Sequence, residues 1–116
     1  MPFDPAPVPQ EITTKPGRFQ KYADAMLRGC QVTGPAAYQL IAGHGHRRRA
    51  CALGAMVIGL GYRADNIEDV ITVLHSDEVM RLGRAYYNEY GWHIERDNDK
   101  GHHTREEIAA RIAALE

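Results

Sequence analysis

Histidine and carboxylate side chains are concentrated in one stretch near the carboxyl end of the sequence, and these groups are suited to acid/base catalysis or metal binding. The stretch contains His93, Asp97, Asp99, His102 and His103. Imidazole and carboxylate groups can exchange protons near neutral pH, and both can hold a hydrolytic metal. Loops also carry such residues for solubility alone. The stretch therefore supports an alternative hypothesis, a metal-dependent or acid/base enzyme that uses residues 93–103.

A second set of metal-ligand types lies in the middle of the chain. His44 and His46 precede Cys51, and Cys30 lies upstream. Zinc takes four nitrogen or sulfur ligands in a tetrahedron, so this set could form a zinc site. The spacing matches no standard zinc finger, and a cysteine in an apolar helix is usually an inert buried thiol. We therefore expect no metal and no cofactor, and two reduced thiols.

The strongest binding candidates are consecutive arginines. Arg47, Arg48 and Arg49 follow the glycine-rich segment that holds His44 and His46, and this pattern is typical of an exposed loop. Guanidinium groups form paired hydrogen bonds with phosphates and carboxylates. The loop is therefore predicted to contact a partner, with nucleic acid or phosphate as one option; a merely solvated loop is the alternative. A further candidate contact, off the apolar stripe of its helix, is Tyr87.

One apolar stretch organises the elements that position these residues. Residues 50–61 contain no polar side chain, which predicts a buried central helix. Bulky residues recur at helical spacing on one side, where they fill a core, and small residues on the other let a second helix approach closely. The bulky stripe is Leu53, Met56, Val57 and Leu60, and the small stripe is Cys51, Ala55 and Gly59.

Helical signals also flank this stretch. Apolar periodicity predicts a first helix over residues 17–28 that stops at Gly29, and residues 36–42 could form one or two helical turns. Asp65 can cap a helix through residue 74, although β-branched residues make a strand over 70–74 the rival interpretation.

The last third of the chain has clearer helix ends. Ser76 as an N-cap and Gly91 as a stop predict a helix over residues 77–90. A polar loop is expected over 95–101. Thr104 and Glu107 form a capping box that opens the final helix.

Composition limits the class of protein. The 116 residues suit one domain, with a proline-rich tail at residues 1–16 and a single helical domain at 17–116. The formal net charge of −1 means that any anion binding must come from a local patch. We find no apolar run long enough for a membrane span and no secretory signal, so we expect a cytoplasmic protein with no membrane contact. The predicted fold is all-α, a compact bundle of about five helices around the central helix.

Three short motifs resemble those of a group of small phage and actinobacterial proteins of uncharacterised function. The motifs are the Cys-Ala-Leu-Gly-Ala segment at 51–55, the Asn98-Asp99 pair and the Thr-x-x-Glu segment at 104–107. The group usually has Trp-Asn-Asp, whereas Trp92 here stands well before Asn98. The resemblance implies a phage-like origin for residues 18–115 and brings no activity with it.

Together these patterns favour a small cytosolic interaction protein over an enzyme. We expect it to bind another macromolecule through the histidine and arginine loop, with a protein partner or self-association into a homo-oligomer as the leading form.

Overall fold

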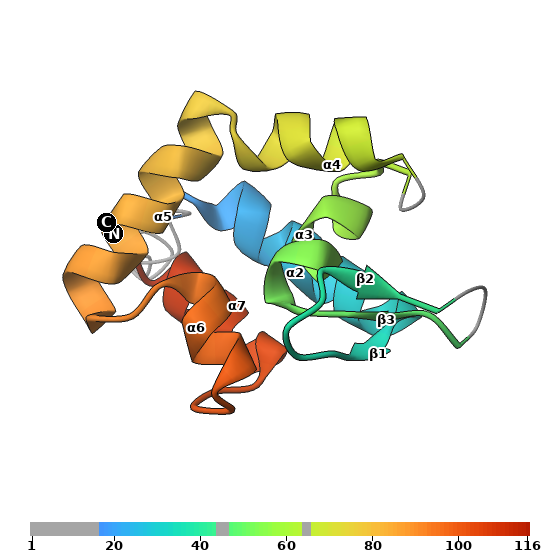
Figure 1. Cartoon of the computed structure of the whole chain (residues 1–116). Coiled ribbons are helices and arrows are strands. Elements are labelled where there is room, and N and C mark those ends of the chain that lie inside the picture. Colours follow the sequence, from blue (N-terminus) through green and yellow to red (C-terminus); the bar gives the residue numbers. More distant parts are fainter. Residues whose placement is uncertain (1–16, 44–46, 64–65) are drawn as a thin grey trace, which may run out of the picture.

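The computed structural model describes residues 17–43, 47–63 and 66–116, and within them it is mainly helical (Figure 1). A small three-stranded sheet lies at one end of the helices, so the expectation of a purely all-α fold needs correction. The tail at residues 1–16 lies outside the described residues. No helix in the described ranges is long and apolar enough to cross a membrane.

The centre of the fold is the crossing of α2 (Gln20–Val32) and α3 (Ala52–Gly59). Their backbones approach so closely that a Cβ added to Gly29 would lie 1.8 Å from the carbonyl oxygen of Ala55. A Cβ on Gly59 would lie 1.6 Å from the oxygen of Ala25. The small side of α3 thus faces another helix, as its sequence predicts.

The bulky side of α3 is buried as expected. Met56 and Val57 are fully inaccessible, while Leu53 and Leu60 are half-buried at its margins. The helix is shorter at both ends than the predicted range of 50–61, because Cys51 is its N-cap and Leu60 its C-cap.

α7 (Arg105–Ala113) packs against α2. The predicted capping box is confirmed, since Thr104 Oγ1 accepts from the Glu107 amide at 3.1 Å and Glu107 accepts from the Thr104 amide at 2.7 Å. Ile108 and Ile112 are fully buried.

α4 (Ile67–Leu74) and α5 (Asp77–Tyr90) form a bent arm, in which α4 packs beside α3 and α5 turns away toward the carboxyl-terminal helices (Figure 1). The rival strand over 70–74 is wrong, because the segment is helical and begins at an N-cap, Asn66. The expected cap, Asp65, lies outside the described residues. The bounds of α5, with Ser76 at its start and a left-handed Gly91 at its end, are those that the sequence predicts.

The arm is tied to α2 by a side-chain hydrogen bond. The hydroxyl of Tyr22 donates to the Glu78 carboxylate. Burial, followed by this carboxylate, raises the pKa of Tyr22 to about 12, so the hydroxyl remains a donor.

The sheet has the order β1 (Gly34–Pro35), β3 (Arg49–Ala50), β2 (Ile41–Ala42). β3 pairs in parallel with β1 and antiparallel with β2. The helical turns expected at residues 36–42 are therefore wrong, because the backbone of this segment pairs with the strand that leads into α3.

Two further corrections concern helix ends. α2 continues through Gly29 to Val32, because Gly29 is needed for the close approach to α3 and does not stop the helix. Residues 95–101 are not all loop, because α6 (Ile94–Asp99) forms there. Its polar residues include a carboxylate buried through contacts with distant segments, a feature that local periodicity does not carry.

Candidate functional site

The carboxylate of Asp97 is fully buried and is the centre of a polar network. Its Oδ2 accepts hydrogen bonds from the hydroxyl of Tyr86 at 2.5 Å and from Nη1 of Arg111 at 3.2 Å. Its Oδ1 lies 2.7 Å from Nδ1 of His103. An ionised carboxylate only accepts, so Nδ1 must carry the proton of that bond. The three donors come from α5, α7 and the loop between α6 and α7.

These donors keep Asp97 ionised. Burial alone would raise the pKa of Asp97, but the hydrogen bonds from Tyr86 and His103 and the charge of Arg111 outweigh it and hold the pKa below its usual value. Burial and the same carboxylate raise the pKa of Tyr86, so its hydroxyl remains a donor. The guanidinium of Arg111 also lies 3.8 Å from the ring centre of Tyr90.

The network brings only part of the predicted histidine and carboxylate cluster together. His103 contacts Asp97, and Nδ1 of His102 lies 3.9 Å from it. His93 lies apart and stacks on Tyr87 with ring centres 4.6 Å from each other. Asp99 faces another way and accepts a hydrogen bond from the Tyr38 amide at 2.8 Å.

The environment of His103 limits what the cluster can do chemically. Besides its bond to Asp97, its ring lies beside Nη1 of Arg111, which is 2.8 Å from Nδ1 and 3.0 Å from Nε2. Both ring nitrogens therefore face protein partners already, and a general base needs one that faces a substrate. Within the described ranges, no three histidine, cysteine or acidic side chains are arranged to hold a metal ion.

Of the two cysteines in the other predicted metal set, Cys51 is buried and Cys30 is half-buried. Cys51 is 3 % exposed, and its sulfur accepts from the Gly54 amide at 3.5 Å at the start of α3. Burial raises the pKa of both thiols, Cys30 and Cys51, which favours the protonated form over the thiolate that binds metals. Their proposed partners His44 and His46 lie outside the described residues.

Asn98 joins two of the motifs that carry the family resemblance. Its Oδ1 accepts from the Ala52 amide at 3.0 Å, so it caps the first turn of α3, and its Nδ2 donates to the Ala36 oxygen at 2.9 Å. The Asn-Asp pair and the Cys-Ala-Leu-Gly segment are thus in direct contact. This contact gives the pair a structural role.

A shallow cleft of about 600 Å³ lies beside this junction. Its lining includes His102, His103, Asn98 and Arg49. Arg105 also lines the cleft and is only 6 % exposed. It donates to the Thr33 hydroxyl at 2.8 Å and to the Thr33 carbonyl at 2.9 Å. Its cation is thus engaged within the fold.

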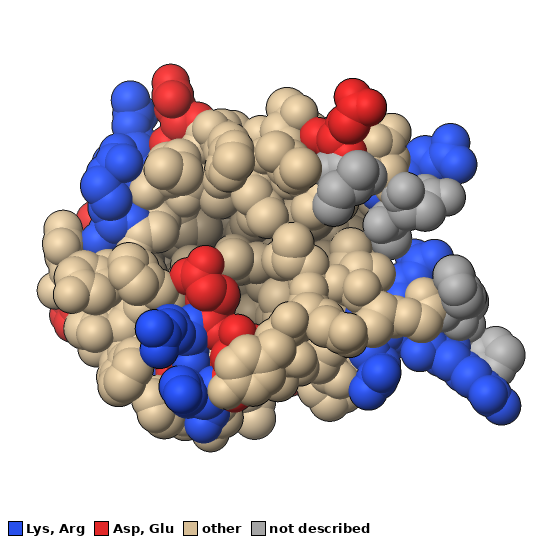
Figure 2. All heavy atoms as spheres, viewed as in Figure 1, with Lys and Arg blue, Asp and Glu red and all other residues tan. Residues whose placement is uncertain are grey.

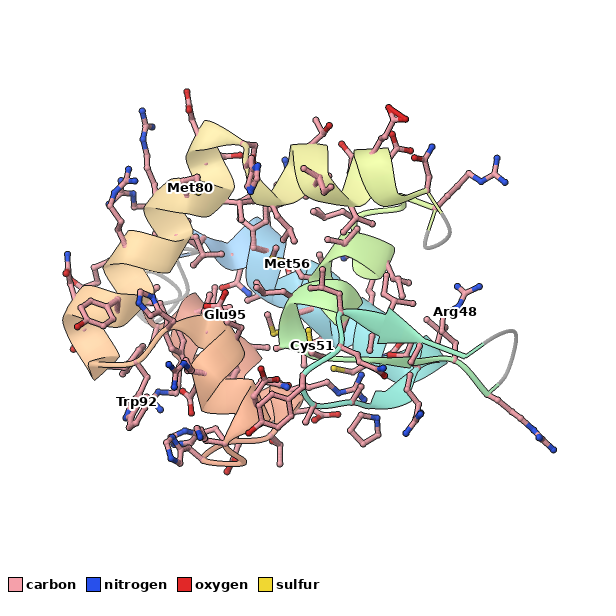
Figure 3. The ribbon with its side chains drawn as sticks, in the orientation of Figure 1. Arg48, Cys51, Met56, Met80, Trp92 and Glu95 are labelled. Atoms are coloured by element: carbon pink, nitrogen blue, oxygen red, sulfur yellow. The ribbon has the colours of Figure 1, made fainter. Side chains whose placement is uncertain are left out.

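The arginines of the predicted binding loop behave differently. β2 and β3 pair as antiparallel neighbours, and residues 44–46 of the segment between them lie outside the described part. Arg47 and Arg49 are exposed and Arg48 is half-buried. None of the three guanidinium groups makes a hydrogen bond or ion pair with another described residue. Figure 2 shows basic side chains projecting at this end of the molecule, and Figure 3 labels Arg48 there.

The remaining predicted contact, Tyr87, lies on a different surface. It is 47 % exposed on α5, a helix that lies at the opposite end of the molecule from the sheet (Figure 1). The predicted binding residues therefore fall into two separate surfaces.

Sequence reasoning missed Tyr86 and Arg111, which complete the network, and it missed the contacts that Asn98 and Arg105 make elsewhere in the fold. One signal was available for Arg105: a cation in the first turn of a helix opposes the helix dipole, so it needs a partner elsewhere. Tyr86 carried no such signal, because its place on the apolar stripe indicates only core packing.

The chain matches no protein-family model, and no curated protein and no solved structure is significantly similar to it. The resemblance to small phage and actinobacterial proteins therefore remains a prediction.

Proposed function

We propose that this protein binds an anionic macromolecule through Arg47, Arg48 and Arg49, which we call the arginine hairpin. The supporting observation is that three consecutive guanidinium groups at one end of the molecule have no hydrogen-bond or ion-pair partner among the described residues. Two cations elsewhere in the fold differ, since Arg111 pairs with Asp97 and Arg105 with Thr33.

The charge balance of the chain means that attraction of an anionic partner depends on this surface. The formal net charge of the chain is −1, so the protein as a whole does not attract polyanions. Attraction must come from the local field of the hairpin, which is strongest at low ionic strength and falls within about 10 Å at 0.1 M salt. The partner is therefore expected to present closely spaced phosphates or carboxylates.

The hairpin is anchored well enough to present these side chains. β3 pairs with a strand on each side, and the Gly34 amide donates to the Arg48 oxygen at 2.9 Å. β3 leads within two residues into α3, whose first turn is capped by Asn98. The backbone that carries the arginines is thus held in place by hydrogen bonds to the rest of the fold.

The test measures binding of labelled duplex DNA and of a labelled polyglutamate peptide by fluorescence anisotropy. The R47Q/R48Q/R49Q variant should bind the preferred probe at least about tenfold more weakly. If the probe is DNA, its salt slope should fall by roughly two to three, because each phosphate contact contributes about 0.9.

The matched control removes the same charge elsewhere. R81Q/R96Q/K100Q also lacks three cations, at exposed positions outside the hairpin. It should bind like the original protein. Equal weakening by both variants, or no binding of either probe by the original protein, would exclude the proposed function.

A further inference from the structure

A second surface, unrelated to the arginine hairpin, is a groove of about 430 Å³ between α5 and the α3 and α6 helices. Figure 2 shows the molecule hollowed there. Apolar side chains from several helices line it, and two of its rim residues, Met80 and Tyr87, are 48 % and 47 % exposed. The other apolar lining residues are Leu53, Leu74, Val79 and Ile94.

A glycine in the wall of this groove lacks an internal explanation. Gly83 lies in the middle of α5, where glycine costs about 1 kcal/mol relative to alanine. A Cβ added there would meet nothing within 4 Å. Gly29 and Gly59, by contrast, are required by the crossing of α2 and α3. The surface of α5 at Gly83 is therefore open to the close approach of another backbone.

The two walls of the groove carry opposite charges. Arg84 lies on α5 and Glu95 on α6, and Figure 3 labels Glu95 and Met80 on the two sides. Both charged side chains are exposed, and neither makes a hydrogen bond or ion pair with another described residue. The groove thus offers one cation and one anion around an apolar floor, both without a partner in the described part of the chain.

This combination points to a particular occupant. In a two-fold symmetric dimer the same patch appears on both partners, so it must complement itself. A patch with both signs of charge can do so, whereas the arginine hairpin would repel its own copy. On α5, Met80 and Tyr87 lie at similar distances before and after Gly83. Antiparallel helices that cross at Gly83 therefore bring Met80 of each near Tyr87 of the other.

We propose that the groove binds α5 of a second copy of this chain, with Gly83 at the crossing point and Arg84 of each copy paired with Glu95 of the other. The proposal does not depend on the arginine hairpin or on its anionic partner.

The first test is the oligomeric state of the full chain by sedimentation equilibrium over a wide concentration range. A monomer–dimer equilibrium is expected. G83Q should raise the dimer dissociation constant by at least about tenfold, because the added side chain blocks the close approach. The fold should tolerate G83Q, since glutamine favours a helix more than glycine and the Cβ has open space.

The second test uses opposite charge reversals. R84E and E95R should each dimerise at least about tenfold more weakly, because both place like charges together across the interface. An equimolar mixture of the two variants should dimerise again, since positions 84 and 95 then carry opposite charges at both symmetry-related contacts. R81Q, on the same helix outside the groove, should dimerise like the original protein.

Three results would overturn the proposal: a monomer at every concentration, a dimer unaffected by G83Q, or variants that do not recover when mixed. A monomer that binds an added amphipathic helical peptide in this groove would also overturn it, and would assign the surface to a different protein partner.

Discussion

Asp97 keeps its charge in the interior because three separate parts of the chain donate hydrogen bonds to it. Removing one member of such a buried charged network is more costly than the net value of the network, because the partner charge is left without compensation. The packing of α5, α6 and α7 against one another thus depends on Asp97.

D97N should therefore lower the free energy of unfolding by about 3 kcal/mol, because it leaves the Arg111 cation without its counter-charge. Urea denaturation followed by circular dichroism measures this change. D99N is the matched control, since its amide oxygen can still accept from Tyr38, and it should cost less than about 1 kcal/mol. Equal losses in the two variants would contradict this role for Asp97.

The same carboxylate predicts an acid-sensitive component of stability. Because the pKa of Asp97 is lowered in the folded protein, its contribution is complete above the unfolded value of 3.8 and is lost as pH falls through the folded pKa. The original protein should lose stability more steeply below about pH 4 than D97N does. Parallel curves of unfolding free energy against pH for the two proteins would show that Asp97 does not titrate in this way.

The sequence indicates that Asp97 and His103 are close but does not indicate their chemistry. Their proximity follows from spacing within one short segment. What decides the chemistry is the pairing with Tyr86 and Arg111, which lie 11 residues before and 14 after Asp97. Those contacts depend on how three helices pack, and no local pattern specifies that packing.

At the scale of the element, most helices were predicted, but the bounds were accurate only where local end signals were present, and the short α6 was missed. α5 and α7 have caps within their own few residues, Ser76, Gly91 and the Thr104 box, so their bounds follow from the sequence. The two-residue strands have no periodicity of their own. They form because neighbouring segments offer backbone partners.

Gly29 shows why a helix end can be misread. A glycine after an apolar stripe can stop a helix or admit another backbone, and only the position of α3 distinguishes the two.

This distinction gives a stability prediction for three equivalent changes. G29A and G59A should each destabilise by about 2 kcal/mol or more, because the new methyl would overlap a backbone carbonyl and force α2 and α3 apart. G83A should instead be neutral or stabilise the monomer by up to about 1 kcal/mol. The comparison is made by thermal unfolding at a concentration where the protein is monomeric. Destabilisation by G83A comparable to that of G29A would mean that Gly83 is packed within the protomer.

At the scale of the whole molecule, the two candidate surfaces are formed by different elements, and the sheet lies at the end away from α5 (Figure 1). The arginine hairpin extends from the sheet, and the groove lies between α5 and the central helices. A single sign of charge at one end suits a foreign anionic partner, while paired charges around an apolar floor suit a second copy. Both can be occupied at once, and a dimer then presents two hairpins.

This arrangement predicts that the two surfaces can be disabled separately. R47Q/R48Q/R49Q should lose anion binding and still dimerise, because its groove is intact. G83Q should remain able to bind a short anionic probe that reaches one hairpin, but should bind a long probe about tenfold or more weakly, because it has lost the second hairpin of the dimer. Anisotropy with short and long probes measures anion binding by each variant, and sedimentation measures its dimerisation. If the arginine variant became monomeric, or if G83Q weakened short-probe binding as much as long-probe binding, the two surfaces would be coupled through the fold and their independence would be wrong.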